Sequence, residues 1–343
     1  MTRLALVLTV LVAALLAGCG ERAEPAPGAG DPQPFRVVLD YFPNADHAGL
    51  FAAQAAGHFE QLGLDVELQA PPDPSAPLKL LEAGRADMVV SYPPEVLLAR
   101  DKGATPVVVG ALVQQPLTSL ISLPRGGVRR VADLRGKRVG TAGIPYQSAY
   151  LRTILDEAGV DPSTVRETNV GFNLTPAMLS GRVDATLGSF WNYEGVDLER
   201  RGRRPVVLRM DRLGVPAYPE LVFAVKRDYL DQDGASKVRR FLQGAARGHA
   251  DLRDDPDAAV GALLDANPDL EPGLQRAVVR RTLPVFFPEA EQRPFGWIEP
   301  AEWAGYVNWM AERDLIKRPD APGQTNEFLP GEGFEEGVQE LQR

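Results

Sequence analysis

The sequence predicts an α/β fold with two lobes joined by two crossing segments. Short apolar runs alternate with stretches of helical periodicity along most of the chain, a pattern typical of sheets covered by helices. A chain of 343 residues usually divides into two such units. The motif Gly84-Arg-Ala-Asp87 returns as Gly181-Arg-Val-Asp184, each time before an apolar strand that runs out to an aromatic residue. This echo predicts two similar lobes whose strand ends face each other.

The N-terminus has the pattern of a bacterial lipoprotein signal. Arg3 precedes an apolar run over residues 4–16, and Leu16-Ala-Gly-Cys19 follows. As a helix this run spans about 20 Å, too short for a hydrocarbon core of about 30 Å. We therefore expect residues 1–19 to be a signal with Cys19 as the lipidated residue, which anchors the mature protein to a bacterial membrane. Residues 20–34 are rich in Pro and Gly and predict a flexible tether.

The remaining elements follow from hydrophobic periodicity. After Asp228 the sequence predicts long helices and no strand. Because Pro and Gly cluster at 123–129 and at 213–220, we place the two crossings there and expect them to act as a hinge. Lobe 1 then comprises residues 35–125 and a helical return over 216–343, and lobe 2 comprises 126–215. The expected strands, in mostly parallel sheets, are 35–39, 64–68, 88–92, 107–113, 117–123, 138–142, 185–191, 206–210 and 221–225, and the expected helices are 49–62, 235–253, 256–265 and 300–313.

The loop after the first strand is the strongest candidate for a ligand cleft. It reads Asp-Tyr-Phe-Pro-Asn-Ala-Asp-His over residues 40–47, at the carboxyl end of a strand, where open α/β sheets bind their ligands. Tyr41 supplies an aromatic face, and Asn44 and His47 supply groups that donate and accept hydrogen bonds. A lone His at a helix start is often only structural, but the polar residues gathered on this loop favour a binding role.

Three further segments carry candidate binding residues at strand ends. Glu194 is suited to accept hydrogen bonds from a ring amino group, and Trp191 or Tyr193 to stack on the ring. The alternative is that Trp191 fills the core and Glu194 is a first-turn helix charge. Backbone N–H groups after Gly143 can meet a ligand oxygen, or the segment is ordinary helix capping. These candidates are Ser91, Tyr92, Gly143, Tyr146, Trp191, Tyr193 and Glu194.

Composition and missing motifs exclude several classes of function. A net charge of -9 and a pI near 5.1, without a basic cluster interleaved with aromatic residues, argue against nucleic acid. The chain lacks the Walker A loop, the His-Glu-x-x-His motif and the Gly-x-Ser-x-Gly motif. A single cysteine excludes an internal disulfide, and three histidines far apart do not suggest a metal site. We therefore predict binding without catalytic residues, metal or cofactor.

The opening motifs resemble those of a known family. Asp-Tyr-Phe-Pro-Asn-x-x-His-x-Gly-Leu over 40–50 and Ala-Gly-His-Phe-x-x-x-Gly-Leu-Asp-Val over 56–66 are similar to the ThiY-like solute-binding proteins, and the likeness extends over about 35–230. The resemblance implies the type II periplasmic binding protein fold, an extracytoplasmic location, and permease and ATPase subunits of an ABC importer as partners. It also implies a thiamine-precursor 4-aminopyrimidine as ligand, such as a hydroxymethyl- or formylaminomethyl-pyrimidine.

Two alternatives remain open within this resemblance. Related binding proteins carry riboflavin or a sulfonate or nitrate, although an anion favours Arg in the cleft and the motifs here offer Glu194 and Asp46. The superfamily also contains pyrimidine-synthesising enzymes, which carry a cofactor-binding Lys and, four residues on, a His in the matching segment. This chain has Ser91 and Glu95 at those positions, so the resemblance does not bring the synthase chemistry with it.

Overall fold

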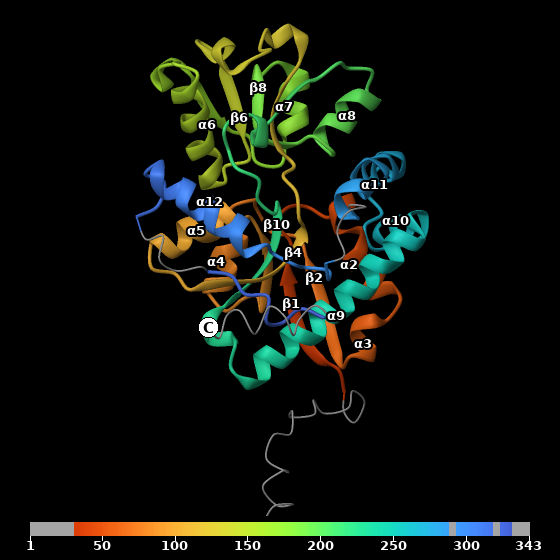
Figure 1. Ribbon diagram of the computed structural model, residues 1–343. Coiled ribbons are helices and arrows are strands. Elements are labelled where there is room, and N and C mark those ends of the chain that lie inside the picture. Colours follow the sequence, from red (N-terminus) through yellow and green to blue (C-terminus); the bar gives the residue numbers. More distant parts are fainter. Residues whose placement is uncertain (1–30, 288–292, 318–322, 331–343) are drawn as a thin grey trace, which may run out of the picture.

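The computed structural model describes residues 31–287, 293–317 and 323–330, and it contains two five-stranded sheets with helices on their faces (Figure 1). This confirms the α/β prediction. Cys19, the signal and most of the tether lie outside the described residues. The first strand begins at Gln33, so the last residues of the predicted tether 20–34 belong to the sheet.

The first sheet, sheet A, has the strand order β2-β1-β3-β10-β4. Strands β1, β2 and β3 are parallel, whereas β10 runs antiparallel to both of its neighbours. Apolar residues, with Val the commonest, dominate β3, β4 and β10, which are almost entirely buried, as expected for strands covered on both faces. The strands are β1 (Gln33–Val38), β2 (Leu64–Gln69), β3 (Met88–Ser91), β4 (Pro106–Val113) and β10 (Leu221–Lys226).

The second sheet, sheet B, has the order β7-β6-β8-β5-β9 and repeats this arrangement. Strand β6 is parallel to β7 and β8, and β5 is antiparallel to β8 and β9. The prediction of mostly parallel sheets is therefore wrong in detail, because the crossing strands β5 and β10 enter their sheets in the opposite direction. The strands are β5 (Thr118–Ser122), β6 (Arg138–Thr141), β7 (Arg166–Asn169), β8 (Ala185–Phe190) and β9 (Val206–Arg209).

The repeated Gly-Arg-x-Asp motif occupies the same place in both sheets. Asp87, before β3, accepts hydrogen bonds from the backbone and guanidinium of Arg36 on β1. Asp184, before β8, accepts the same bonds from Arg138 on β6. In each lobe the Arg also donates to the carbonyl of the motif glycine. The echo therefore marks one local device used twice, an Arg that joins a helix end to the neighbouring strand.

The first crossing differs from the prediction. Strand β4 ends in sheet A at Val113, and β5 already pairs with β8 and β9 of sheet B from Thr118 onward. The chain thus crosses at 114–117 and not at 123–129, and the strand predicted at 117–123 belongs to the second lobe. Pro and Gly at 123–129 mark a turn after the crossing. The return falls between β9 and β10, over a stretch that includes 213–220.

The helices cover both sheets. The predicted helix 49–62 is divided in two because Gly57 adopts a left-handed φ of 69°. Bounds of the helices are η1 (Ala45–His47), α2 (Ala48–Ala55), α3 (His58–Gln61), α4 (Pro77–Glu82), α5 (Pro93–Asp101), α6 (Pro145–Glu157), α7 (Leu174–Ser180), α8 (Glu194–Arg200), α9 (Gln232–Asp254), α10 (Pro256–Ala266), α11 (Pro272–Phe286) and α12 (Pro300–Glu312). Among the described residues, no helix is both long and apolar enough to cross a membrane.

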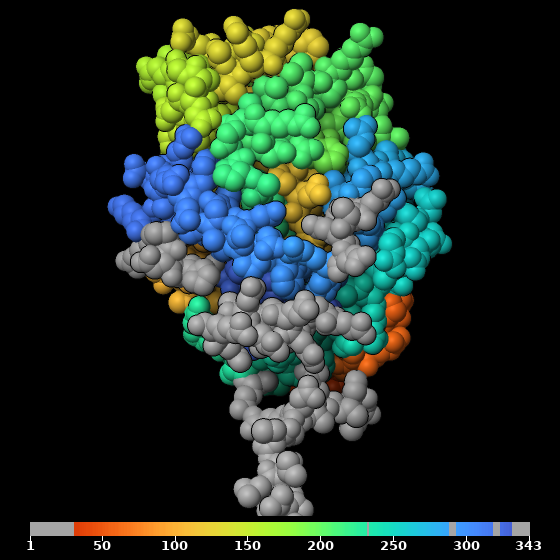
Figure 2. Space-filling model, viewed as in Figure 1, coloured from red at the N-terminus to blue at the C-terminus, as the bar shows by residue number. Residues whose placement is uncertain are grey.

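The C-terminal helices divide between the lobes. Helices α9 and α10 pack on α2 of the first lobe, as predicted. Helix α11 also contacts α8, and Tyr306 on α12 bonds through its hydroxyl to Tyr150 on α6, both elements of the second lobe. In Figure 2 the blue C-terminal segment lies against the green part of the second lobe. The return segment 216–343 therefore belongs to lobe 1 only in part, because two of its helices reach across.

Candidate ligand-binding site

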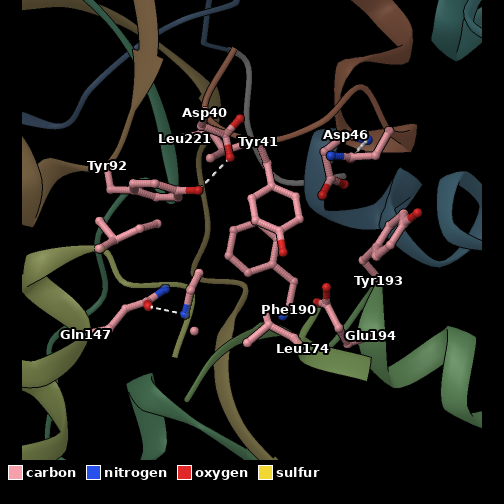
Figure 3. A pocket seen from close by; sticks show the side chains of 14 residues that line it. Asp40, Tyr41, Asp46, Tyr92, Gln147, Leu174, Phe190, Tyr193, Glu194 and Leu221 are labelled. Atoms are coloured by element: carbon pink, nitrogen blue, oxygen red, sulfur yellow. Dashed lines mark hydrogen bonds between the residues drawn. The ribbon is translucent and has the colours of Figure 1, made fainter. Parts of the chain in front are cut away.

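A pocket lies between the carboxyl ends of the central strands of the two sheets (Figure 3). Both lobes contribute, because the loops after β1 and β3 meet those after β6 and β8. Its cavity volume is about 20 Å³, room for about one water molecule. A ring-sized ligand therefore enters only if the lobes or side chains move apart. The lining residues are Asp40, Tyr41, Asn44, Asp46, Tyr92, Ala142, Ile144, Gln147, Leu174, Gly188, Phe190, Tyr193, Glu194 and Leu221.

Asp40 is held in place by two donors. The hydroxyl of Tyr92 donates to its Oδ2 at 2.6 Å, and His47 Nε2 lies 2.8 Å from its Oδ1. The backbone N–H of Asn44 donates to His47 Nδ1, so this nitrogen carries no proton and Nε2–H is the donor to Asp40. His47 is fully buried, and both ring nitrogens are used within the protein. His47, predicted as a ligand-binding residue, therefore does not line the pocket, and its imidazole orients Asp40.

Asp46 approaches the pocket from the same loop. Its backbone N–H is capped by the Asn44 side chain, which also donates to Phe42 O. Its carboxyl Oδ1 accepts from Asn192 Nδ2, a residue of the second lobe, at 2.7 Å. Burial raises the pKa of Asp46 to about 7, although the hydrogen bond from Asn192 acts in the opposite direction. The carboxyl thus sits where a ligand donor stabilises its ionised form.

Glu194 provides a second carboxyl, from the opposite lobe. The backbone N–H of Phe190 donates to its Oε2 at 2.7 Å, which fixes the side chain in the turn between β8 and α8. Figure 3 shows the carboxyl pointing into the pocket beside Tyr193 and Phe190. Burial raises the pKa of Glu194 to about 8, and the nearby Asp46 acts in the same direction. No lysine or arginine is present among the lining residues.

Gln147 contributes an amide donor from the first turn of α6. Its Oε1 accepts from the backbone N–H of Ala142, so its Nε2 is left for other partners. That amide lies over Gly188, which has a φ of 93°, and a Cβ on Gly188 would be only 2.0 Å from Nε2. A glycine is therefore required in β8 at the point where Gln147 enters the pocket.

Aromatic side chains close the pocket around these polar groups. Tyr41 packs edge-on against Phe172 with ring centroids 4.7 Å apart, and its hydroxyl reaches Gly171 O of the second lobe at 3.4 Å. Tyr92 and Phe190, the aromatic residues that end the two echoed strand segments, face each other with centroids 6.5 Å apart. The predicted meeting of these two strand ends is thus present in the structure.

The structure brings together half of the predicted site residues. Tyr41, Asn44, Tyr92, Tyr193 and Glu194 line the pocket. Among the others, Ser91 is buried in sheet A and Tyr146 packs its ring 5.2 Å from that of Tyr92, behind the pocket wall. Gly143 has a φ of 81° and serves the turn into α6, with the Asn169 side chain packed where a Cβ would stand.

Trp191 does not line the pocket. Its Nε1 donates to Pro116 O at 3.1 Å, and the Arg209 guanidinium lies 5.2 Å from its ring centroid. Phe190, the last residue of β8, lines the pocket instead, whereas Trp191 is the first residue of the turn that follows. Of the two rings predicted to stack on a ligand, Tyr193 lines the pocket and Trp191 does not.

Several lining residues were absent from the prediction. Asp40, Asp46 and Gln147 lie in the segments that the sequence singled out, so the strand-end rule alone was enough to include them. Leu174 and Leu221 carry no sequence signal, because they reach the pocket only through the packing of α7 and the return of β10. Within the described ranges, no group of three or more His, Cys, Asp or Glu side chains is arranged to hold a metal ion.

The buried carboxyls predict that stability falls as the pH rises. Burial raises the pKa of Asp46, Glu95 and Glu220 to about 7 and that of Glu194 to about 8. The folded chain then binds more protons than the unfolded chain, in which these groups titrate near pH 4. We expect the free energy of unfolding, from urea titrations, to fall by on the order of 2 kcal/mol between pH 6.5 and 8.

The range from pH 6.5 to 8 lies above the titration of His249, which has the opposite effect on stability. Burial lowers the pKa of His249 to about 4, so its contribution to stability rises with pH, mainly below pH 6.5. A stability that is flat or rising between pH 6.5 and 8 contradicts the prediction. The Glu194→Gln variant should show a smaller decrease than the parent, since it lacks the carboxyl whose pKa is raised most.

Two lobes that close over a pocket between strand ends define the class to which this protein belongs. The fold is that of the periplasmic binding proteins. The structure superposes on the alkanesulfonate-binding protein SsuA of Xanthomonas axonopodis pv. citri, bound to MOPS, with a TM-score of 0.64 and 21% sequence identity, over 87% of this chain and 99% of that chain. At this identity the likeness concerns the fold alone.

Sequence comparison identifies the family. A family model described as NMT1/THI5 like matches residues 44–259, and the chain belongs to the NMT1/THI5-like family. The formylaminopyrimidine-binding protein of Halalkalibacterium halodurans is 32% identical over 285 residues, which cover 82% of this chain and 86% of that protein. A protein of Legionella pneumophila named 4-amino-5-hydroxymethyl-2-methylpyrimidine phosphate synthase is 28% identical over 301 residues, covering 86% and 92%. Of these two relatives, one is named for binding and the other as an enzyme.

Proposed function

We propose that this protein is the solute-binding component of an ABC importer and that it binds a 4-aminopyrimidine precursor of thiamine, such as a hydroxymethyl- or formylaminomethyl-pyrimidine. The observation that carries the proposal is the pair of carboxyls, Glu194 and Asp46, that enter one closed pocket from opposite lobes. A ring that carries an amino group supplies the N–H donors that such carboxyls need.

The remaining lining groups suit a flat, uncharged ring. Tyr41, Tyr92, Phe190 and Tyr193 supply aromatic surface, and Gln147 supplies an amide donor for a ring nitrogen. A sulfonate or nitrate would meet the carboxyls without a lining arginine or lysine to balance its charge. Riboflavin would require a wider opening of the pocket than a pyrimidine.

We propose binding and not catalysis. The segment that would carry the synthase Lys and His has Ser91 buried in β3 and Glu95 half-buried on α5. Neither side chain supplies the amine or the imidazole of the synthases. In the proposed setting Cys19 carries the lipid anchor, the protein acts outside the cytoplasm, and its partners are the permease and ATPase subunits of the importer.

Thermal unfolding with a panel of ligands tests the proposal. We expect 4-amino-5-hydroxymethyl-2-methylpyrimidine or its formylamino analogue to raise the melting temperature of the chain without residues 1–19. A ligand at 100 times its dissociation constant adds about 2.7 kcal/mol to the free energy of unfolding. Thiamine, riboflavin, taurine and nitrate are the comparison ligands. If only an anion or only the flavin raises the melting temperature, the pyrimidine proposal is wrong. Turnover of a candidate substrate, with or without pyridoxal phosphate, would favour an enzyme.

A further inference from the structure

Asn192 joins three elements at the meeting of the two lobes. It lies in the turn between β8 and α8, between the pocket residues Phe190 and Tyr193 in the sequence. Its Nδ2 donates to Asp46 Oδ1 on η1 of the first lobe at 2.7 Å and to Thr282 Oγ1 on α11 at 2.9 Å. Asn192 and Thr282 are fully buried, and Asp46 is 2% exposed. One amide therefore ties the second lobe both to a pocket carboxyl and to a helix of the C-terminal segment.

The orientation of this amide follows from its partners. The hydroxyl of Thr282 donates its only proton to Val278 O, so Thr282 Oγ1 accepts from Asn192 and the NH2 group must face it. Asn192 Oδ1, in contrast, is buried without a hydrogen-bond partner among the residues that the structure describes. An unpaired buried acceptor opposes folding, and an apolar side chain of the same size would avoid it. Core packing alone does not favour Asn192 here, whereas its two donations across the lobes do.

We propose that Asn192 is the latch of lobe closure and that it couples the closed state to a ligand on Asp46. When the lobes part, the Asn192 amide leaves both acceptors together, because they belong to the other side of the cleft. A ligand donor on the second oxygen of Asp46 holds this carboxyl in place and so strengthens the bond that closes the lobes. Asn192 acts through Asp46 and has no contact with the ligand, so it is a positioning residue.

The latch can be tested first without a ligand. Spin labels are placed on exposed residues of the two lobes by Gln61→Cys and Arg166→Cys, in the full-length chain carrying Cys19→Ser. The distance between the two labels is measured by double electron–electron resonance. In the parent we expect a narrow distribution of this distance. Asn192→Leu should broaden this distance distribution and shift most molecules to the distances of the open state. Thr282→Val, which removes one acceptor and keeps the Asp46 bond, should have a smaller effect.

The ligand measurement rests on the proposed function and has a separate readout. With 4-amino-5-hydroxymethyl-2-methylpyrimidine as the probe, Asn192→Leu should speed dissociation by about 10- to 100-fold, the loss expected for one buried hydrogen bond to a charged group. The association rate should change by less than about threefold, because the open state that captures ligand lacks the latch. If Asn192→Leu only disturbed packing, it would lower the melting temperature without speeding dissociation selectively over association.

A matched control removes another contact between the lobes. Arg313 on the C-terminal side pairs with Glu157 of α6, and both side chains are about one-third exposed, so Arg313→Ala should leave distances and rates nearly unchanged. If Asn192→Leu does not fold, Asn192→Ser is used, since its side chain is too short to span both acceptors. If the Asn192 variant has the same interlobe distances and the same dissociation rate as the parent, the proposal that Asn192 is a latch is wrong. If the parent fails to bind any aminopyrimidine, the proposed function falls, while the distance measurement still decides the latch.

Discussion

Replacing Glu220 with alanine is expected to lower the free energy of unfolding by about 3–5 kcal/mol. Glu220 lies at the end of the return crossing and is fully buried. Its Oε2 accepts from the backbone N–H groups of Leu117 and Thr118 at 2.6 and 2.7 Å, and its Oε1 accepts from Thr118 Oγ1 at 2.6 Å. One carboxyl thus joins the two segments that connect the lobes.

The size of this effect follows from the donors left behind. Alanine at position 220 leaves the N–H groups of Leu117 and Thr118 buried without an acceptor, and each such group costs about 1–3 kcal/mol. Urea unfolding at pH 6.5 measures the loss, and the exposed residue Glu60 provides the control, since Glu60→Ala should change stability by less than about 0.5 kcal/mol. A loss below about 1 kcal/mol for Glu220→Ala would show that water or other groups replace the carboxyl. Glu220 would then not be needed to join the two segments that connect the lobes.

Replacing Glu194 with glutamine is expected to weaken aminopyrimidine binding by at least about 100-fold, which corresponds to about 2.7 kcal/mol or more. The backbone N–H of Phe190 points at the side chain, so the single oxygen of the glutamine amide must accept it. The NH2 group then faces the pocket, where it meets the ligand amino group, another donor. The variant loses a charge-assisted hydrogen bond and gains a repulsion, although the contact with Phe190 that holds the turn is kept.

Isothermal titration with 4-amino-5-hydroxymethyl-2-methylpyrimidine measures this loss. Glu199→Gln is the matched control on the same helix, because Glu199 is half-exposed and pairs with Arg281 at the surface. We expect the control to change affinity by less than about fivefold. Equal affinity of the parent and the Glu194→Gln variant would remove Glu194 from the ligand contact, and with it the main argument for an amino-bearing ligand.

The candidate site was predictable where local rules decide position. Tyr41, Asn44, Tyr92, Tyr193 and Glu194 follow buried strands, and the rule that strand ends carry ligands was sufficient to find them. His47 and Trp191 lie in the same segments but face away from the pocket. Which side of a loop a residue faces depends on partners such as Asp40 and Arg209, which the sequence alone does not place.

The errors in the fold have the same origin. Proline and glycine at 123–129 indicate a turn, and a turn signal does not distinguish a crossing between sheets from a turn within one lobe. The crossing at 114–117 became evident only from the pairing of β5 with β8 and β9. Likewise, Gly57 interrupts a continuous apolar pattern, and the break in the helix at this point depends on how α3 packs beside α9.

By itself the sequence determined the α/β class, the two similar halves and the loops that carry the site, because periodicity, turn residues and a repeated Gly-Arg-x-Asp motif act over short distances along the chain. Only the tertiary structure decided which side chains share the pocket and which residues hold the lobes together. Asn192, Thr282 and Glu220 acquire their roles from partners far away in sequence, and such contacts depend on how two sheets and the returning helices meet in space.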